Sequence, residues 1–180
     1  MLYKKKTKMT LFNNKIINSK EMFLKGEFYT TIEIPLHDTI KYEIDKATNN
    51  LMLDRVLNVA MGYPCNYGYI EGTLGKDGDA IDVCMILDKP IVPGAYVLSR
   101  AVGVLLMEDE SGVDQKILAV PVKSEFNYLK NINEVPQTLL NKIQHFFERY
   151  KDLEKGKWVK VDQWKNKDAA IQILLDSCTI

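Results

Sequence analysis

Residues 97–107 read Val97-Leu98-Ser99-Arg100-Ala101-Val102-Gly103-Val104-Leu105-Leu106-Met107 and set the architecture. A Glu110-Ser111-Gly112 turn connects this run to a second apolar run, Val113 to Val122. Two such runs on either side of a short turn predict adjacent β-strands. Neither run is long enough to cross a bilayer, so no membrane partner is expected.

The rest of the chain predicts further strands, followed by helices. Short strands with turns between them are expected at Phe28 to Ile34, Ile40 to Asp45, Leu51 to Val56 and Ile81 to Leu87. Strands of this kind favour a small β-barrel. Between Val135 and Tyr150 apolar residues recur at helical spacing, with Pro136 near the start, and a second helix is expected after Trp164. The sequence thus predicts a mainly β protein with two flanking C-terminal helices, in one domain spanning 28–180.

Composition narrows the possible functions. Lys and Arg together number 24, as do Asp and Glu, so the basic surplus that is typical of nucleic-acid-binding proteins is missing. The three cysteines are widely spaced and form no C-x-x-C motif, which predicts reduced thiols and a cytoplasmic location. With two histidines in the chain, a metal site would be built mainly from oxygen ligands, which favours magnesium, manganese or calcium.

The N-terminal residues 1–27 are predicted to form a basic, mobile extension. Residues 1–20 are rich in lysine and contain neither acid nor arginine. They lack the apolar core and the cleavage site of a secretory signal. A targeting peptide is the alternative to a mobile tail, although such peptides are normally rich in arginine.

The strongest local signal is the acidic motif Asp77-Gly78-Asp79-Ala80-Ile81-Asp82-Val83. Its three carboxylates repel one another unless a cation neutralises them or one of them takes up a proton. Side chains alternate along a strand, so bringing Asp82 to the side of Asp77 and Asp79 requires a bend, which Gly78 can supply. An EF-hand loop is excluded by the positions of its ligands and glycine. A solvated turn and a metal site remain alternatives on these residues alone.

A second acidic group lies at Glu108 to Lys116. If residues 110–113 form the hairpin loop, Asp109 and Asp114 are cross-strand neighbours on one face. Lys116 shares the face of Asp114, because it stands two residues further along the strand. An exposed, charged hairpin tip is the alternative.

The first hairpin is expected to bring two cations together. With residues 46–50 as its loop, the opposing pairs are Asp45 and Leu51, Glu43 and Leu53, and Lys41 and Arg55. Two cations directly across a sheet destabilise it unless an anion lies between them, and a phosphate would serve. A register shifted by two would instead pair Arg55 with Glu43 in an ordinary salt bridge.

Two further clusters are ambiguous when taken alone. Met61 to Tyr69 is a loop dense in tyrosine, whose hydroxyls either bind anionic oxygens or simply pack. Tyr150 to Trp158 follows the long helix with mixed charge and reads equally as a solvated helix end.

Five of these segments, in this order, resemble the family I (soluble) inorganic pyrophosphatases of bacterial type. They are Ile32-Glu33-Ile34-Pro35, the segment Ile40 to Lys46, Tyr63-Pro64-Cys65-Asn66-Tyr67-Gly68, the acidic motif, and the segment His145 to Trp158. The resemblance covers the chain from about Thr31 to Trp164. It departs from the family pattern at three places, which are Ala80 in place of proline or glutamate, Gly62 in place of a bulkier residue, and Arg149 in place of histidine.

The resemblance implies a five-stranded, OB-like closed barrel that assembles, in bacteria, into a homohexamer. It implies several Mg²⁺ ions per site, with Mn²⁺ as a possible substitute, bound by Asp77, Asp82, Asp109, Asp114 and Glu33. It implies that the phosphates are held by Lys41, Arg55, Tyr67, Lys116, Tyr150 and Lys151, supported by Glu43 and Tyr63. Asp79 matches the residue that accepts a proton from the nucleophilic water, and Lys41, Arg55 and Tyr67 count with it among the catalytic groups.

The expected function is therefore hydrolysis of inorganic pyrophosphate to two phosphates. A metal-activated water attacks in line, and no phosphoenzyme is needed. Two alternatives remain, which are another metal-dependent phosphohydrolase and a non-catalytic, OB-like nucleic-acid-binding module. The second alternative would require a basic face with stacking aromatic residues rather than clustered acids.

Overall fold

The computed structural model describes residues 11–12, 15–16, 18–45, 47–48 and 50–180. In chain order its elements are β1 (Leu11–Phe12), β2 (Lys15–Ile16), α1 (Lys20–Leu24), β3 (Glu27–Ile34), β4 (Ile40–Ile44), β5 (Leu51–Val56), β6 (Asn66–Tyr69), β7 (Asp82–Met85), β8 (Tyr96–Asp109), β9 (Gly112–Val113), β10 (Lys116–Pro121), the 3-10 helices η1 (Glu125–Tyr128) and η2 (Ile132–Glu134), α2 (Gln137–Arg149), β11 (Val159–Asn166) and α3 (Lys167–Asp176). The protein is mainly β with few helices, as predicted.

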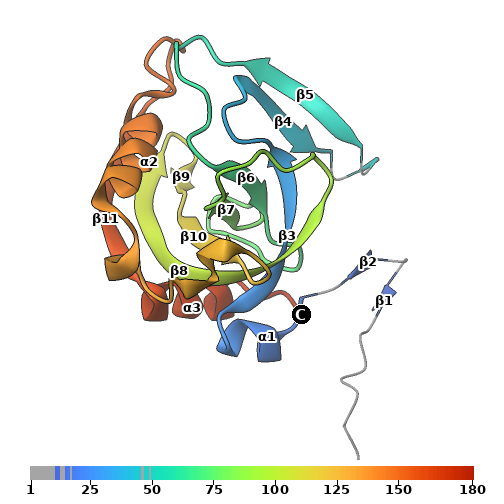
Figure 1. The fold of residues 1–180 in the computed structure, drawn as a ribbon. Coiled ribbons are helices and arrows are strands. Elements are labelled where there is room, and N and C mark those ends of the chain that lie inside the picture. The colour runs from blue at the N-terminus through green and yellow to red at the C-terminus, as the bar shows by residue number, and fades with distance from the viewer. Residues whose placement is uncertain (1–10, 13–14, 17, 46, 49) are drawn as a thin grey trace, which may run out of the picture.

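The strands are arranged around β8, the fourteen-residue strand predicted from residues 97–107. Pairings run from β10 through β7, β6 and β3 to β8, and β8 pairs in turn with β10, so that five strands follow one another in a circuit (Figure 1). All of these pairs are antiparallel except β7 with β10, which is parallel and sets Asp82 beside Lys116. β11 pairs with the far half of β8. One long strand therefore connects most of the sheet.

Several strands differ from their predicted extents. Residues 66–69 belong to strand β6 and not to a loop as predicted, because Asn66–Tyr69 pairs with both β3 and β7. The run 113–122 is divided into β9 and β10, with a break at residues 114–115. The strand expected at 81–87 is shorter, Asp82–Met85. β11 and α1 were not predicted.

The hairpin of β4 and β5 forms a two-stranded sheet of its own and projects beside the circuit (Figure 1). Lys41 pairs with Arg55, as predicted, and the alternative register is excluded. A β-bulge after Lys41 shifts the remaining pairs by one residue. The predicted pairs of Glu43 with Leu53 and of Asp45 with Leu51 are therefore wrong. Glu43 pairs with Met52 instead, and Leu51 pairs with Ile44.

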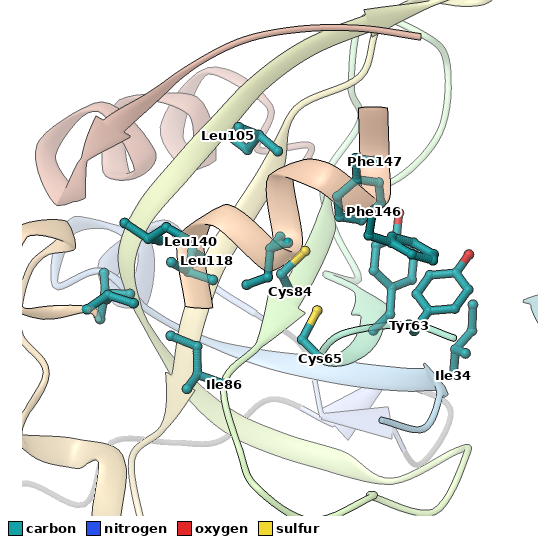
Figure 2. Close-up of a cluster of buried hydrophobic side chains, with 14 of the residues drawn as sticks. Ile34, Tyr63, Cys65, Cys84, Ile86, Leu105, Leu118, Leu140, Phe146 and Phe147 are labelled. Atoms are coloured by element: carbon teal, nitrogen blue, oxygen red, sulfur yellow. The ribbon is translucent and has the colours of Figure 1, made fainter. Parts of the chain in front are cut away.

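Helix α2 closes one side of the main core. It begins directly after Pro136, and it buries four apolar side chains, Leu140, Ile143, Phe146 and Phe147. In Figure 2 Phe146 and Phe147 lie beside Tyr63, and the ring centroids of Phe146 and Tyr63 are 4.7 Å apart. Removing one such buried aromatic side chain typically costs about 3–5 kcal/mol. This packing fixes the end of α2, from which the segment Tyr150 to Trp158 continues.

A second core lies between the sheet, α1 and α3. Phe23 of α1, Phe28 of β3 and Leu174 of α3 are among its fully buried side chains. Packed structure thus extends into the segment 1–27, for which a mobile extension was predicted, while residues 1–10, 13–14 and 17 lie outside the described residues. None of the helices in the described part of the chain is long and apolar enough to cross a membrane.

Gly62 is explained by a close approach of two backbone segments. A Cβ atom at this position would lie 2.4 Å from the carbonyl oxygen of His37. The same contact is held by two backbone hydrogen bonds, from His37 N to Tyr63 O at 2.8 Å and from Tyr63 N to Asp38 O at 2.9 Å. His37 itself has a positive φ of 70°. The backbone of the loop before β4 therefore leaves no room for a side chain at position 62, which lies after β5.

Substitution Gly62→Ala is expected to destabilise the fold by about 1–3 kcal/mol, because the new methyl group forces the two segments apart. The measurement is the free energy of unfolding from urea titration. The control is Gln172→Ala, at an exposed position of helix α3. An unchanged midpoint for Gly62→Ala would show that the loop moves freely and that the contact is unimportant.

Candidate active site

One pocket of about 560 Å³ gathers every residue that was predicted for the site. Its walls come mainly from six parts of the fold. They are the end of β3, the β4–β5 hairpin, the segment from residue 63 into β6, the acidic motif with the start of β7, the connection from β8 to the start of β10, and the segment that follows α2. The predicted residues in its lining are Glu33, Lys41, Glu43, Arg55, Tyr63, Tyr67, Asp77, Asp79, Asp82, Asp109, Asp114, Lys116, Tyr150 and Lys151. Segments more than a hundred residues apart in the sequence thus contribute to one hollow.

The acidic motif folds as a tight turn at the edge of the pocket. Gly78 has a φ of 90°, a conformation that strongly favours glycine, and the amide of Asp79 donates to Asp77 Oδ1 at 3.0 Å. The predicted bend at Gly78 is confirmed, since Asp77, Asp79 and Asp82 all line the pocket. Burial, followed by the charges of Asp82 and Asp79, raises the pKa of Asp77 above its ordinary value. The turn holds its carboxylates against their mutual repulsion.

Lys116 stands at the floor of the pocket between two of these acids. Its Nζ lies 2.6 Å from Asp82 Oδ2 and also contacts Asp114 Oδ1. The Lys116 side chain is 3% exposed. Burial alone would lower the pKa of Lys116, but Asp82 and Asp114 outweigh this effect and raise it well above the ordinary value. The ammonium therefore stays charged and compensates both carboxylates.

Asp109 and Asp114 reach the pocket by a different route from the one predicted. Asp109 pairs with Gly112 across the hairpin, so the predicted direct pairing with Asp114 is wrong. The amide of Asp114 donates to Met107 O at 2.9 Å, which turns the chain towards β10. Burial raises the pKa of Asp114, and the charge of Asp82 adds to this effect. Both carboxylates nevertheless line the same wall.

The segment after α2 contributes two cations to this wall. Lys151 Nζ contacts Asp109 Oδ2 at 2.7 Å and Glu110 Oε2 at 3.1 Å, and Lys157 Nζ contacts Glu110 Oε1 at 2.6 Å. Burial opposes ionisation of Glu110, but hydrogen bonds from Lys157 and Lys151 prevail and lower its pKa to about 2. Glu110 thus joins the β8–β9 hairpin to the segment 151–157.

The first hairpin supplies the two cations that face each other across its strands. Asp54 lies between them, with Oδ2 at 3.1 Å from Lys41 Nζ and at 2.7 Å from Arg55 Nη1. Lys41 also contacts the carboxylate of Glu43, and Arg55 Nε donates to Glu154 Oε1 at 2.9 Å. The anion expected between these cations is therefore present, and it is a side chain of the hairpin itself.

Three tyrosines form the aromatic side of the pocket. Tyr63 and Tyr67 lie with their ring centroids 5.2 Å apart, and Tyr150 stacks on Phe146 at 5.4 Å. Burial raises the pKa of each of these three phenols above the ordinary value. Their hydroxyls consequently remain protonated at neutral pH and are able to donate hydrogen bonds to anionic oxygens.

Glu33, at the end of β3, is buried beneath the hairpin. Its Oε1 accepts a hydrogen bond from the amide of Ile44 at 2.8 Å. Burial is the main cause that raises the pKa of Glu33 to about 7, and the charge of Asp82 acts in the same direction. The Glu33 carboxyl therefore lies close enough to Asp82 for an electrostatic interaction between the two acids.

Five charged residues in or beside the site were not predicted: Asp54, Glu71, Glu110 and Lys157, which line the pocket, and Glu154, which contacts Arg55. Asp54 could have been predicted from the sequence as a partner of the two cations, because it immediately precedes Arg55 and lies opposite Lys41 in the hairpin. No sequence pattern around Glu110 or Glu154 distinguishes them from ordinary acidic residues on the surface. Their roles depend on contacts between segments about forty to a hundred residues apart, which the sequence alone does not reveal.

The acidic residues fit a hard divalent cation by their chemistry. Every predicted metal ligand is a carboxylate, and Mg²⁺ prefers oxygen ligands. In the described part of the chain, no three His, Cys, Asp or Glu side chains stand together as a ready cage. The ammonium of Lys116 lies between Asp82 and Asp114 instead. Cations are accommodated here if the carboxylates exchange part of this internal pairing for metal contacts.

Comparisons with known proteins agree with this geometry. A protein-family model described as inorganic pyrophosphatase matches residues 30–179. The inorganic pyrophosphatase of Salmonella typhimurium is 52% identical over 151 residues, which cover 82% of this chain and 86% of that protein. The inorganic pyrophosphatase of Xylella fastidiosa is 50% identical over 158 residues, covering 86% of this chain and 89% of the relative.

Solved structures give the same result. The inorganic pyrophosphatase of Helicobacter pylori superposes with a TM-score of 0.82 at 47% identity, covering 84% of this chain and 91% of that chain. The Thermus thermophilus enzyme also reaches 0.82, at 41% identity, with 86% and 90% covered. Fold, sequence and the residues of the pocket point in one direction, and the chain belongs to the family of inorganic pyrophosphatases.

Proposed function

We propose that this protein hydrolyses inorganic pyrophosphate to two phosphates, through direct in-line attack by water and without a phosphoenzyme. The observation that carries the proposal is the composition of a single pocket. Five cationic side chains, Lys41, Arg55, Lys116, Lys151 and Lys157, line it together with the carboxylates of the acidic motif and of the β8–β10 connection. A small, multiply charged anion that arrives with metal ions matches such a lining.

The cations of the chain bind the phosphates. In the structure each of them is engaged by a carboxylate, as Lys41 and Arg55 are by Asp54. Substrate binding therefore replaces internal carboxylates with phosphate oxygens. The guanidinium of Arg55 suits paired contacts with one phosphate, while the lysines provide compact charges. The protonated hydroxyls of Tyr67 and Tyr150 add neutral donors.

Asp79 is proposed as the group that accepts a proton from the attacking water. It lies on the turn of the acidic motif and lines the pocket. Asp77, Asp82, Asp109, Asp114 and Glu33 would hold Mg²⁺, or Mn²⁺ in its place, which would supply acidity to that water and neutralise phosphate charge. The chain itself positions both phosphates and stabilises the charge that develops on the leaving phosphate through Lys41, Arg55 and Lys151.

Three further features are proposed with this function. A five-stranded, OB-like closed barrel is supported by the circuit of five paired strands. Self-association to a homohexamer is supported by β5, where Met52, Leu53 and Val56 present apolar side chains that are more than half exposed. A cytoplasmic location is supported by the free thiols of Cys65, Cys84 and Cys178.

Purified protein is expected to release phosphate from pyrophosphate in the presence of Mg²⁺ and to stop when a chelator is added. Substitution Asp82→Asn should lower the rate about 100-fold or more, because the carboxylate next to Lys116 is needed to hold the cation. The measurement is a colorimetric phosphate assay on the wild type and the variant.

The matched control is Glu148→Gln on the exposed side of α2, which should keep full activity. ATP and simple phosphomonoesters are tested in parallel, because rapid hydrolysis of these compounds would favour the broader phosphohydrolase alternative. Folded wild-type protein without activity at any Mg²⁺ or Mn²⁺ concentration would contradict the proposed reaction.

Glu33 is expected to make the stability of the metal-free protein depend on pH. Its pKa is about 7 in the folded protein against an ordinary value of 4.5. As pH rises from 4.5 to 7, the unfolded chain loses this proton before the folded protein does, so the free energy of unfolding falls by about 3 kcal/mol. Above this window Glu33 adds no further pH dependence.

Substitution Glu33→Gln removes this titration and keeps the acceptor for the amide of Ile44. In urea titrations with chelator present, the variant should therefore gain stability relative to the wild type between pH 4.5 and 7. The control Glu148→Gln should follow the wild-type curve. A constant difference between Glu33→Gln and the wild type across this range would mean that burial does not hold the proton on Glu33.

A further inference from the structure

The β4–β5 hairpin has little support of its own. It is a two-stranded sheet outside the strand circuit, in which β4 is joined to β3 by the hydrogen bond from Ile44 N to Glu33 Oε1 at 2.8 Å, whereas β5 lies on the outer side of β4. Most of the β5 side chains are exposed. The hairpin nevertheless carries Lys41 and Arg55, which are proposed to bind phosphate. A phosphate ligand must be held to within a fraction of an ångström, so β5 needs support from another part of the chain.

That support comes from the segment after α2. Among the described residues, the contact of Arg55 Nε with Glu154 Oε1 at 2.9 Å is the hydrogen bond that joins a β5 side chain to residues outside the hairpin. The Glu154 side chain is 11% exposed and that of Arg55 is 27% exposed. Glu154 is not part of the pocket lining. It therefore reaches the substrate only through Arg55.

The segment that carries Glu154 is itself anchored on the opposite wall. Lys151 contacts Asp109, and Lys157 contacts Glu110, so both ends of the segment 151–157 are attached to the end of β8. Within it, the amide of Glu154 donates to Lys151 O at 2.9 Å. Glu154 thus projects from an anchored segment towards the β4–β5 hairpin.

The orientation of the guanidinium follows from its two carboxylate partners. Glu154 takes the Nε donor and Asp54 takes an Nη1 donor. Arginine has five N–H donors in a planar fork, so these two contacts fix the plane and leave donors for a phosphate. Asp54 belongs to the hairpin and moves with it. Glu154 connects Arg55 to the segment after α2 and, through that segment, to the opposite wall of the pocket.

We propose that Glu154 is a positioning residue for pyrophosphate hydrolysis, which holds the Arg55 guanidinium in register with the opposite wall of the pocket. The inference rests on the proposed role of Arg55 as a phosphate ligand. The length of the Glu154 side chain matters more than its charge in this role, because its oxygen must lie at hydrogen-bond distance from Arg55 Nε.

Two substitutions separate reach from charge. Glu154→Asp keeps the charge but withdraws the oxygen by one methylene group, and Glu154→Gln keeps the reach and the acceptor oxygen but loses the charge. With Mg²⁺ and pyrophosphate, kcat/KM should fall about tenfold for Glu154→Asp. It should fall less than about threefold for Glu154→Gln. The control pair Glu148→Asp and Glu148→Gln, at an exposed position of helix α2, should leave kcat/KM unchanged.

A double-mutant cycle tests whether Glu154 acts through Arg55. Arg55→Ala alone should lower kcat/KM strongly, and adding Glu154→Asp to it should cause no further loss. The urea midpoints of all variants are measured in parallel. A structural role would shift the midpoint equally with or without Arg55, whereas positioning predicts a loss of activity that disappears in the Arg55→Ala background.

Each other outcome overturns the inference in a recognisable way. A larger loss for Glu154→Gln than for Glu154→Asp would assign the effect to charge. An equal loss in both backgrounds would show that Glu154 acts independently of Arg55. Full activity of Glu154→Asp with a damaged Arg55→Ala would refute positioning and leave the proposed function intact. Full activity of Arg55→Ala would refute the proposed role of Arg55 as well.

Discussion

Lys116 places a buried ammonium group between the carboxylates of Asp82 and Asp114, at the point where β7 and β10 run parallel. Taking an unpaired charge out of water costs several kcal/mol, so none of these three groups can be buried here alone. Their mutual compensation allows acids and bases to occupy the floor of one pocket. The other ion pairs of the site follow the same rule, as Lys151 does with Asp109. The pocket is thus lined by acids and bases that pair with one another.

Hydrophobic periodicity predicted the elements whose pattern is strong and uninterrupted. The strands around 97–107 and the helix of Phe146 and Phe147 were found for this reason. β6 was missed because Asn66–Tyr69 follows a proline and contains a glycine, which resemble a loop unless the partner strands are known. One of the three predicted pairs of the first hairpin was correct, since a bulge after Lys41 adds one residue that no sequence rule locates.

The site divides in a similar way. The acidic motif and the clusters around Lys41 and Lys116 were predictable because each is compact in sequence, and the resemblance assigned them to one pocket. The carboxylates that hold the cations in place were not. Glu110 and Glu154 acquire their roles only when the chain brings the end of β8, the hairpin and the segment after α2 together. Such partners are a property of the tertiary structure and leave no local pattern.

Strand β8 also determines how the molecule opens. It pairs with β3, β9, β10 and β11, so the amides of its central residues become accessible to solvent only when most of the sheet separates. Among the described strands β5 pairs with β4 and with no other, so it separates at a lower cost in free energy. Hydrogen exchange along the chain should consequently be slowest on the wall that carries Asp109 and fastest on the wall that carries Arg55. The protein can therefore lose one side of its pocket, and regain it, without unfolding the other.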